Sequence, residues 1–236
     1  MRALSLIVPF ALLASVAPAF AGTIAIEGSG QVRAAPDMAT VSSGVTTQGA
    51  TAKEALDANS TAMTALIEAL KGSGIEARDI QTSGFSVSPN YVYSEERDAS
   101  GYSLPPKING YQVANSVSVV VRDLEKLGSI LDQSVTVGAN TVNGIEFSVT
   151  DPSELLDEAR KAAFADARAK AELYALASGT TLGDIEKISE SRDYAVPVAY
   201  AMAERAVAAD KVPVEAGELS FSITVNVEWD LENTKK

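Results

Sequence analysis

The chain has 236 residues and contains neither cysteine nor histidine. Without cysteine it forms no disulfide, thiolate metal site or cysteine nucleophile. Without histidine it also lacks the usual general base and a common zinc ligand, which excludes most hydrolase and transition-metal chemistry. Its formal charge of −12 repels nucleic acid and anionic lipid. The composition therefore predicts no nucleic-acid partner and no thiol or imidazole active site.

The first 21 residues have the pattern of a secretory signal peptide. Arg2 precedes an apolar run from Ala3 to Phe20, which ends in the small-x-small cleavage signal Ala19-Phe20-Ala21. We expect cleavage between Ala21 and Gly22 and export to the cell envelope. The alternative is a retained membrane anchor, but Pro18 breaks the helix just ahead of the small residues. No later run is apolar enough to span a membrane, so we predict no spanning helix in the mature chain.

Strand and helix patterns alternate along the mature chain. Apolar–polar alternation predicts strands at 23–33, 38–48, 80–93, 111–122, 141–150, 185–193 and 218–229. Helical spacing predicts helices at 51–71, 124–137 and 152–178. The turn Ala34-Ala35-Pro36-Asp37 predicts that the first two strands form a hairpin. We predict the α+β class in the order β-β-α-β-β-α-β-α-β-β, with an antiparallel or mixed sheet, helices on one side, and a single domain over 22–236.

The helix at 152–178 has an inner face of alanines. Asp151 is its predicted N-cap, followed by Pro152 in the first turn. Alanine recurs every fourth residue, at Ala159, Ala163, Ala167 and Ala171. Such small residues let a helix lie close to a sheet or to another helix.

No motif in the chain carries recognisable catalytic chemistry. Gly28-Ser29-Gly30 lies within a strand and lacks the later residues of a nucleotide loop, so we interpret it as a bulge or an edge twist. There is no Gly-x-Ser-x-Gly and no Ser-x-x-Lys. Acidic pairs such as Glu95/Glu96 and Asp157/Glu158 fit solvated charge. We predict no catalytic residue, no cofactor and no metal site, leaving open an enzyme that uses carboxylates alone, such as a glycosidase.

Tyrosines gather at two long loops, predicted at 94–110 and 194–217. The aromatic and methionine side chains concerned are Tyr91, Tyr93, Tyr102, Tyr111, Tyr194, Tyr200 and Met202. Tyrosine and methionine in long loops are typical of contact surfaces. We predict that these side chains form a homo-oligomer interface. The alternative is that both loops fold back and cover the sheet of their own subunit.

Several segments resemble the SIMPL domain family, of the bacterial periplasmic immunogenic and oxidative-stress defence type. They are Gly28-Ser29-Gly30, Pro36-Asp37-Met38-Ala39, the run AFADARAKA at 163–171, and Leu182-Gly183-Asp184-Ile185. The resemblance covers nearly all of the mature chain. It implies a periplasmic α+β protein that self-assembles, with a channel-like ring as one form, and that supports envelope and oxidative-stress tolerance. It implies no enzyme activity and supplies no catalytic residue.

The residues leave a second class of function open. An apolar pocket between the sheet and the alanine-rich helix, lined by tyrosines, would make the chain a periplasmic small-molecule binding module.

Overall fold

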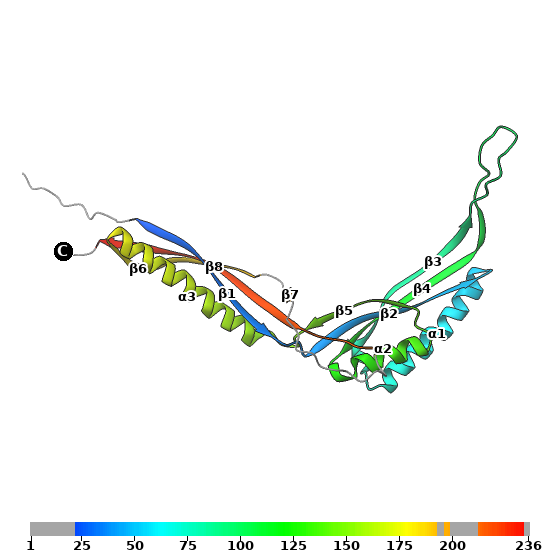
Figure 1. Ribbon diagram of the computed structural model, residues 1–236, viewed down its shortest axis with the longest axis horizontal. Helices are drawn as coiled ribbons and strands as arrows, with labels where there is room; N and C mark the ends of the chain where they lie inside the picture. Colours follow the sequence, from blue (N-terminus) through cyan, green and yellow to red (C-terminus); the bar gives the residue numbers. More distant parts are fainter. Residues whose placement is uncertain (1–21, 193–195, 199–211, 234–236) are drawn as a thin grey trace, which may run out of the picture. The chain divides into compact units, whose positions relative to one another are not determined.

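The computed structural model of the chain describes residues 22–192, 196–198 and 212–233. Its elements are β1 (Thr23–Ala34), β2 (Met38–Gly49), α1 (Ala52–Gly72), the 3₁₀ helix η1 (Ala77–Asp79), β3 (Ile80–Val92), β4 (Lys107–Val121), the 3₁₀ helix η2 (Leu124–Lys126), α2 (Leu127–Thr136), β5 (Thr141–Ser148), α3 (Ser153–Ser178), β6 (Thr180–Arg192), β7 (Val196–Val198) and β8 (Glu218–Asn233) (Figure 1). Helices and antiparallel strands together confirm the predicted α+β class. Strand β7 lies inside the segment 194–217, which the sequence predicted to be a loop.

Contacts divide the chain into two compact units. Among the described residues, the first unit holds 22–31, 158–192 and 223–233, and its strands have the order β1-β8-β6. The second holds 32–157, 196–198 and 212–222, and its sheet has the order β3-β4-β2-β5. A single domain over 22–236 stays a prediction, which one cooperative unfolding transition would support.

In the second unit, α1 and α2 bury one face of the sheet. Alternate valines of the two central strands point toward the helices, including Val41 on β2 and Val117 on β4. They pack with Leu66 of α1 and Leu127 of α2, and all four side chains are buried. The apolar residues that alternate along the strands and those at helical spacing in α1 therefore form a single core.

The predicted hairpin between the first two strands is wrong. β1 pairs with β8, whereas β2 is a central strand that pairs with β4 on one side and β5 on the other. The turn before β2 is held by the end of β5, because the Asp37 amide donates to the Ser148 carbonyl (3.1 Å) and the Thr150 amide donates to Asp37 Oδ1 (2.8 Å). With both edges of β2 occupied, no edge is left for β1.

Helix α1 starts where the sequence predicted and is tied to the sheet through a buried amide. Thr51 caps it by accepting a hydrogen bond from the Glu54 amide (3.2 Å). Asn59 of α1 is fully buried, and its Nδ2 donates to the carbonyls of Val45 (2.8 Å) and Val113 (3.3 Å). These bonds fix the position of α1 over β2 and β4, since a buried polar group is costly unless it is paired.

In the first unit, α3 lies directly on β1. A Cβ atom on Gly28 would stand 2.2 Å from the Ala163 carbonyl oxygen, and one on Gly30 would stand 2.0 Å from the Ala159 carbonyl oxygen. The alanines of the inner face are buried, as their spacing predicted. Our interpretation of the two glycines as a bulge or edge twist missed this role, since they are the only residues small enough for so close an approach.

Side chains of α3 also occupy the outer edge of β1. The Ser29 amide donates to Asp166 Oδ2 (2.9 Å), and Lys170 Nζ donates both to that carboxylate (2.7 Å) and to the Glu27 carbonyl (3.1 Å). The Lys170 hydrogen bond, with help from the Ser29 amide, holds the pKa of Asp166 below its ordinary value. These contacts satisfy backbone groups that an edge strand would otherwise expose to a foreign strand.

A methyl group at Gly30 should destabilise the chain. Because the new Cβ would collide with α3 backbone rather than with a flexible side chain, Gly30→Ala should lower the free energy of unfolding by about 1–3 kcal/mol or more. The matched control is Gly72→Ala at the end of α1, where a Cβ would meet nothing within 4 Å. That change should raise stability by about 0.5–1 kcal/mol. Urea unfolding followed by circular dichroism measures both, and equal effects would contradict the close approach.

An ion pair links the start of β3 to the end of β4, at the open end of the hairpin opposite its connecting loop. Asp79, at the end of η1, is 8% exposed and accepts hydrogen bonds from Nε (3.1 Å) and Nη2 (2.9 Å) of Arg122, the residue after β4. The Arg122 hydrogen bond holds the pKa of Asp79 below its ordinary value, although burial opposes this. The ionised pair therefore contributes to folding at neutral pH.

Acidification should destabilise the wild-type chain more than an Asp79→Asn variant. Since the folded state lowers this pKa, the contribution of ionised Asp79 is present above a pH of about 4 and is lost as the pH falls through the folded-state pKa. Asp79→Asn should be less stable at pH 7, and the gap should close toward a pH of about 2. Urea unfolding at several pH values measures this. Asp57→Asn, in the exposed Lys53–Asp57 pair, is the control and should change stability little.

Candidate functional site

Strand β3 is an edge strand with both faces exposed to solvent. It pairs with β4 on one side, and in the described chain no strand pairs with its other side. Every residue from Gln81 to Ser88 is exposed, including Phe85 at 58% and Val87 at 43%. Large apolar side chains on an unpaired edge are the usual mark of a contact surface or an aggregation site.

The apolar surface continues to the tip of the β3–β4 hairpin, which Figure 1 shows extending beyond α1 and α2. We define the hairpin surface as the exposed side chains of Phe85, Val87, Tyr91, Val92, Tyr93, Tyr102 and Ile108. Tyr93 and Tyr102 are the most open, at 77% and 74% exposure. The first loop therefore does not fold back over its own sheet, which was the alternative to an interface.

The connection at the tip has its own hydrogen bonds. Asp98 Oδ1 accepts from the amides of Ser100 (2.9 Å) and Tyr102 (3.0 Å), and Arg97 Nη1 donates to the Gly101 carbonyl (2.7 Å). The loop is shorter than the predicted 94–110, because β4 begins at Lys107. A turn closed in this way presents Tyr102 in a defined position.

The structure brings some of the predicted interface residues together and not others. Tyr91, Tyr93 and Tyr102 share the hairpin surface, whereas Tyr111 is half-buried within β4 opposite Pro89. The remaining predicted residues, Tyr194, Tyr200 and Met202, lie outside the described residues, as does Ala21 of the predicted cleavage site. Sequence reasoning missed Phe85, Val87, Val92 and Ile108. Alternation placed Phe85, Val87 and Val92 in a predicted strand, and Ile108 fell in the predicted loop 94–110. Nothing in the sequence marked β3 as an edge.

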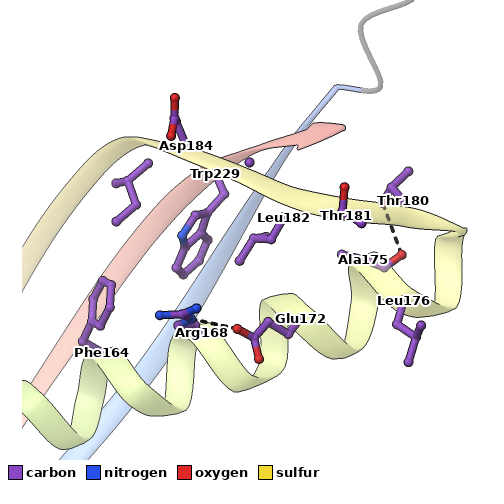
Figure 2. A pocket seen from close by; sticks show the side chains of 12 residues that line it. Phe164, Arg168, Glu172, Ala175, Leu176, Thr180, Thr181, Leu182, Asp184 and Trp229 are labelled. Atoms are coloured by element: carbon purple, nitrogen blue, oxygen red, sulfur yellow. Dashed lines mark hydrogen bonds and ion pairs between the residues drawn. The ribbon is translucent and has the colours of Figure 1, made fainter. Parts of the chain in front are cut away.

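A second feature is an open groove in the first unit, between the C-terminal half of α3 and β6. Its volume is about 610 Å³. Trp229 of β8, only 2% exposed, forms the floor, and its indole ring lies 6.3 Å from the ring of Phe164 at an interplanar angle of 49°. Figure 2 shows Trp229 and Leu182 in the space between strand and helix, with Arg168 reaching in from α3.

Two consecutive bulges in β6 lie along this groove. The β6–β8 register passes from Leu182 opposite Leu231 to Ile185 opposite Trp229, and then shifts again before Lys187. Extra residues on one strand bend it and strengthen its twist. The bulged stretch of β6, from Leu182 to Ile185, is part of the lining of the groove.

The charged residues that line the groove are Arg168, Glu172 and Asp184. Arg168 Nε donates to Glu172 Oε1 at 2.7 Å, and both side chains are more than half exposed. Asp184 points away from α3 in Figure 2. The charge of Asp230 raises the pKa of Glu186, with burial and an Asp230 hydrogen bond as smaller causes, but neither of these two residues lines the groove.

The described residues hold neither a cluster of metal ligands nor a membrane-spanning helix. No group of three or more Asp or Glu residues there is placed to hold a metal ion. Likewise, within residues 22–192, 196–198 and 212–233, no helix has both the length and the apolar character needed to cross a membrane.

An exposed edge strand, a tyrosine-bearing hairpin and an open groove characterise this as an α+β protein with prominent contact surfaces. A family model described as SIMPL, protein of unknown function (DUF541), matches residues 24–229. The chain belongs to the SIMPL family, as the segments at 28–30, 36–39, 163–171 and 182–185 indicated.

Similar proteins are known from several bacteria. The 26 kDa periplasmic immunogenic protein of Brucella melitensis is 40% identical over 214 residues, covering 89% of this chain and 84% of that protein. The uncharacterized protein YggE of Escherichia coli is 29% identical over 218 residues, covering 89% and 83%. YggE of Edwardsiella ictaluri is 30% identical over 168 residues, covering 70% and 66%. These relatives are named as immunogenic or uncharacterized proteins and not as enzymes.

Proposed function

We propose that this chain is a non-enzymatic periplasmic protein that assembles with copies of itself through the hairpin surface and supports envelope and oxidative-stress tolerance. The observation that carries the proposal is the double exposure of β3, an edge strand with Phe85 and Val87 open to solvent. A second copy would cover both the apolar side chains and the unpaired backbone edge.

The assembly we propose is a closed one. One hairpin surface meeting a different patch on the next copy makes a head-to-tail contact, which closes into a ring when the rotation between copies allows it. A channel-like ring is such a form. Tyr91, Tyr93 and Tyr102 supply large contact area with few rotatable bonds, which suits them to be anchors.

Location and chemistry support the same function. The Brucella relative is named as periplasmic, and the first 21 residues have a signal-peptide pattern. Because cysteine is absent, protection against oxidants cannot proceed through thiol oxidation of this chain and must be indirect.

A charged residue on β3 should reduce the assembly. Phe85→Asp puts a carboxylate into the contact, so light scattering coupled to size exclusion should give a lower particle mass than for wild type. Gln81→Asp, an exposed position on the same strand, is the matched control and should keep the mass. A second variant, with 94–106 replaced by a short Gly-Ser turn, should also lower the mass without unfolding the chain.

The same variants link assembly to stress tolerance. In a strain without the gene, wild type and Gln81→Asp should restore survival after peroxide treatment, whereas Phe85→Asp should not. A wild-type particle that stays monomeric at every concentration would overturn assembly. Full rescue by a monomeric Phe85→Asp would overturn its link to tolerance.

Export should leave Gly22 at the mature N-terminus. Mass spectrometry of the periplasmic fraction should find the chain without its first 21 residues. Leucine at both Ala19 and Ala21 removes the small residues that the peptidase requires, so this variant should keep its leader and stay with the membrane fraction. Leucine at Ala17 is the control and should be processed normally.

The groove between α3 and β6 favours a second candidate function, the binding of a small molecule. It lies between the sheet and the alanine-rich helix, and its lining includes Phe164, Leu182 and Ile185. Among the described residues no tyrosine lines this groove, so the predicted lining by tyrosines is not seen there.

A further inference from the structure

We propose that the groove between α3 and β6 binds a small amphiphile with an apolar body and a single anionic head group, such as a carboxylate or a sulfonate. The inference rests on the second candidate function and names the class of ligand for that site. The apolar floor recognises the body of the ligand, and Arg168 recognises its head.

The groove has the size and lining of a small-molecule site. Its volume of about 610 Å³ falls within the range of about 300–1,000 Å³ that is common for such sites. The floor is built from Trp229, Phe164 and Leu182, on three different elements. At the mouth, Leu176 is 79% exposed and Ile185 is 45% exposed. A ligand covering these two side chains removes apolar surface from water, which favours binding.

Arg168 is positioned to bind an anion beside this floor. Its Nε is held by Glu172 at 2.7 Å, and its two Nη nitrogens make no further hydrogen bond to the described residues. Figure 2 shows the guanidinium group between α3 and Trp229, on the groove side of the helix. Guanidinium nitrogens bind a carboxylate through two parallel hydrogen bonds, so a free Nη pair next to an apolar floor fits an amphiphile.

Glu172 limits the charge of the ligand. Its carboxylate already neutralises part of the Arg168 charge, so a head group with two negative charges would meet repulsion. The other nearby carboxylate, on Asp184, points away from α3 and does not compete for Arg168. One negative charge is therefore the best match.

Trp229 makes the test direct, because it is the only tryptophan of the chain. The probe is 8-anilinonaphthalene-1-sulfonate, an aromatic sulfonate that absorbs light where tryptophan emits. Added to the full mature protein, it should quench Trp229 emission in a saturable way. Decanoate should displace it, whereas decanol and decyltrimethylammonium at equal concentration should displace it about tenfold less well.

Two substitutions on the same helix separate the head-group contact from general effects of charge. Arg168→Gln should weaken binding of the probe about tenfold, which is the loss of roughly 1.4 kcal/mol expected for a charged hydrogen-bond pair. Arg160→Gln is the matched control, since Arg160 forms an exposed ion pair with Glu190 and does not line the groove. Its dissociation constant should stay within about twofold of wild type.

The outcomes distinguish the ligand class from the binding function. If no saturable quenching occurs, the groove binds no amphiphile and the second candidate function itself fails. If quenching saturates and Arg168→Gln weakens it, but decanol competes as well as decanoate, the binding function stands and the preference for an anionic head group is wrong. If Arg168→Gln binds as wild type does, Arg168 does not contact the probe and the proposal is overturned. Probe bound at the hairpin surface would also be insensitive to Arg168, and so it counts against the proposal.

Discussion

The arrangement of the first unit depends on the near-contact between β1 and α3. Gly28 and Gly30 leave no side chain between the strand and the helix backbone, and Ala159 and Ala163 present only methyl groups. This approach brings Asp166 and Lys170 within hydrogen-bonding distance of the β1 edge. On the side of α3 that faces β6, larger side chains and the bulged strand keep helix and strand apart, and the groove lies between them. The close approach of α3 to β1 thus covers one strand edge, while the wider spacing at β6 forms the groove.

The edge strands of the two sheets differ in how far they are covered. In the first unit, two backbone groups of β1, the Ser29 amide and the Glu27 carbonyl, are bonded by α3 side chains. In the second unit, β3 has no strand on its outer side within the described ranges, and Phe85 and Val87 are open to water. A chain with so negative a charge resists nonspecific association through repulsion. Specific contact through an exposed apolar edge is compatible with that repulsion, because short-range packing acts only once two surfaces fit.

Local signals in the sequence predicted the elements well and their partners poorly. Helical spacing gave α1, and Asp151 with Pro152 gave the start of α3, nearly at their observed bounds, since caps and periodicity are properties of neighbouring residues. The hairpin from Pro36 failed because strand alternation does not state which strand lies alongside. For the site, the tyrosines near the first loop were found from composition and loop length. The exposure of Phe85 was missed. A pocket between the sheet and the alanine-rich helix was expected, but its lining by Trp229 and Phe164 was not, since that lining brings together elements far apart in the chain.

By itself, the sequence determined the α+β class, the helices, the lack of thiol and imidazole chemistry, and the resemblance to the SIMPL family. These follow from composition and from patterns within short windows. Only the tertiary structure decided that β2 is central, that β3 is an edge, and that Gly28 and Gly30 face the alanines of α3. The physical reason is that burial and edge exposure arise from long-range packing, which a residue's neighbours in the chain do not specify.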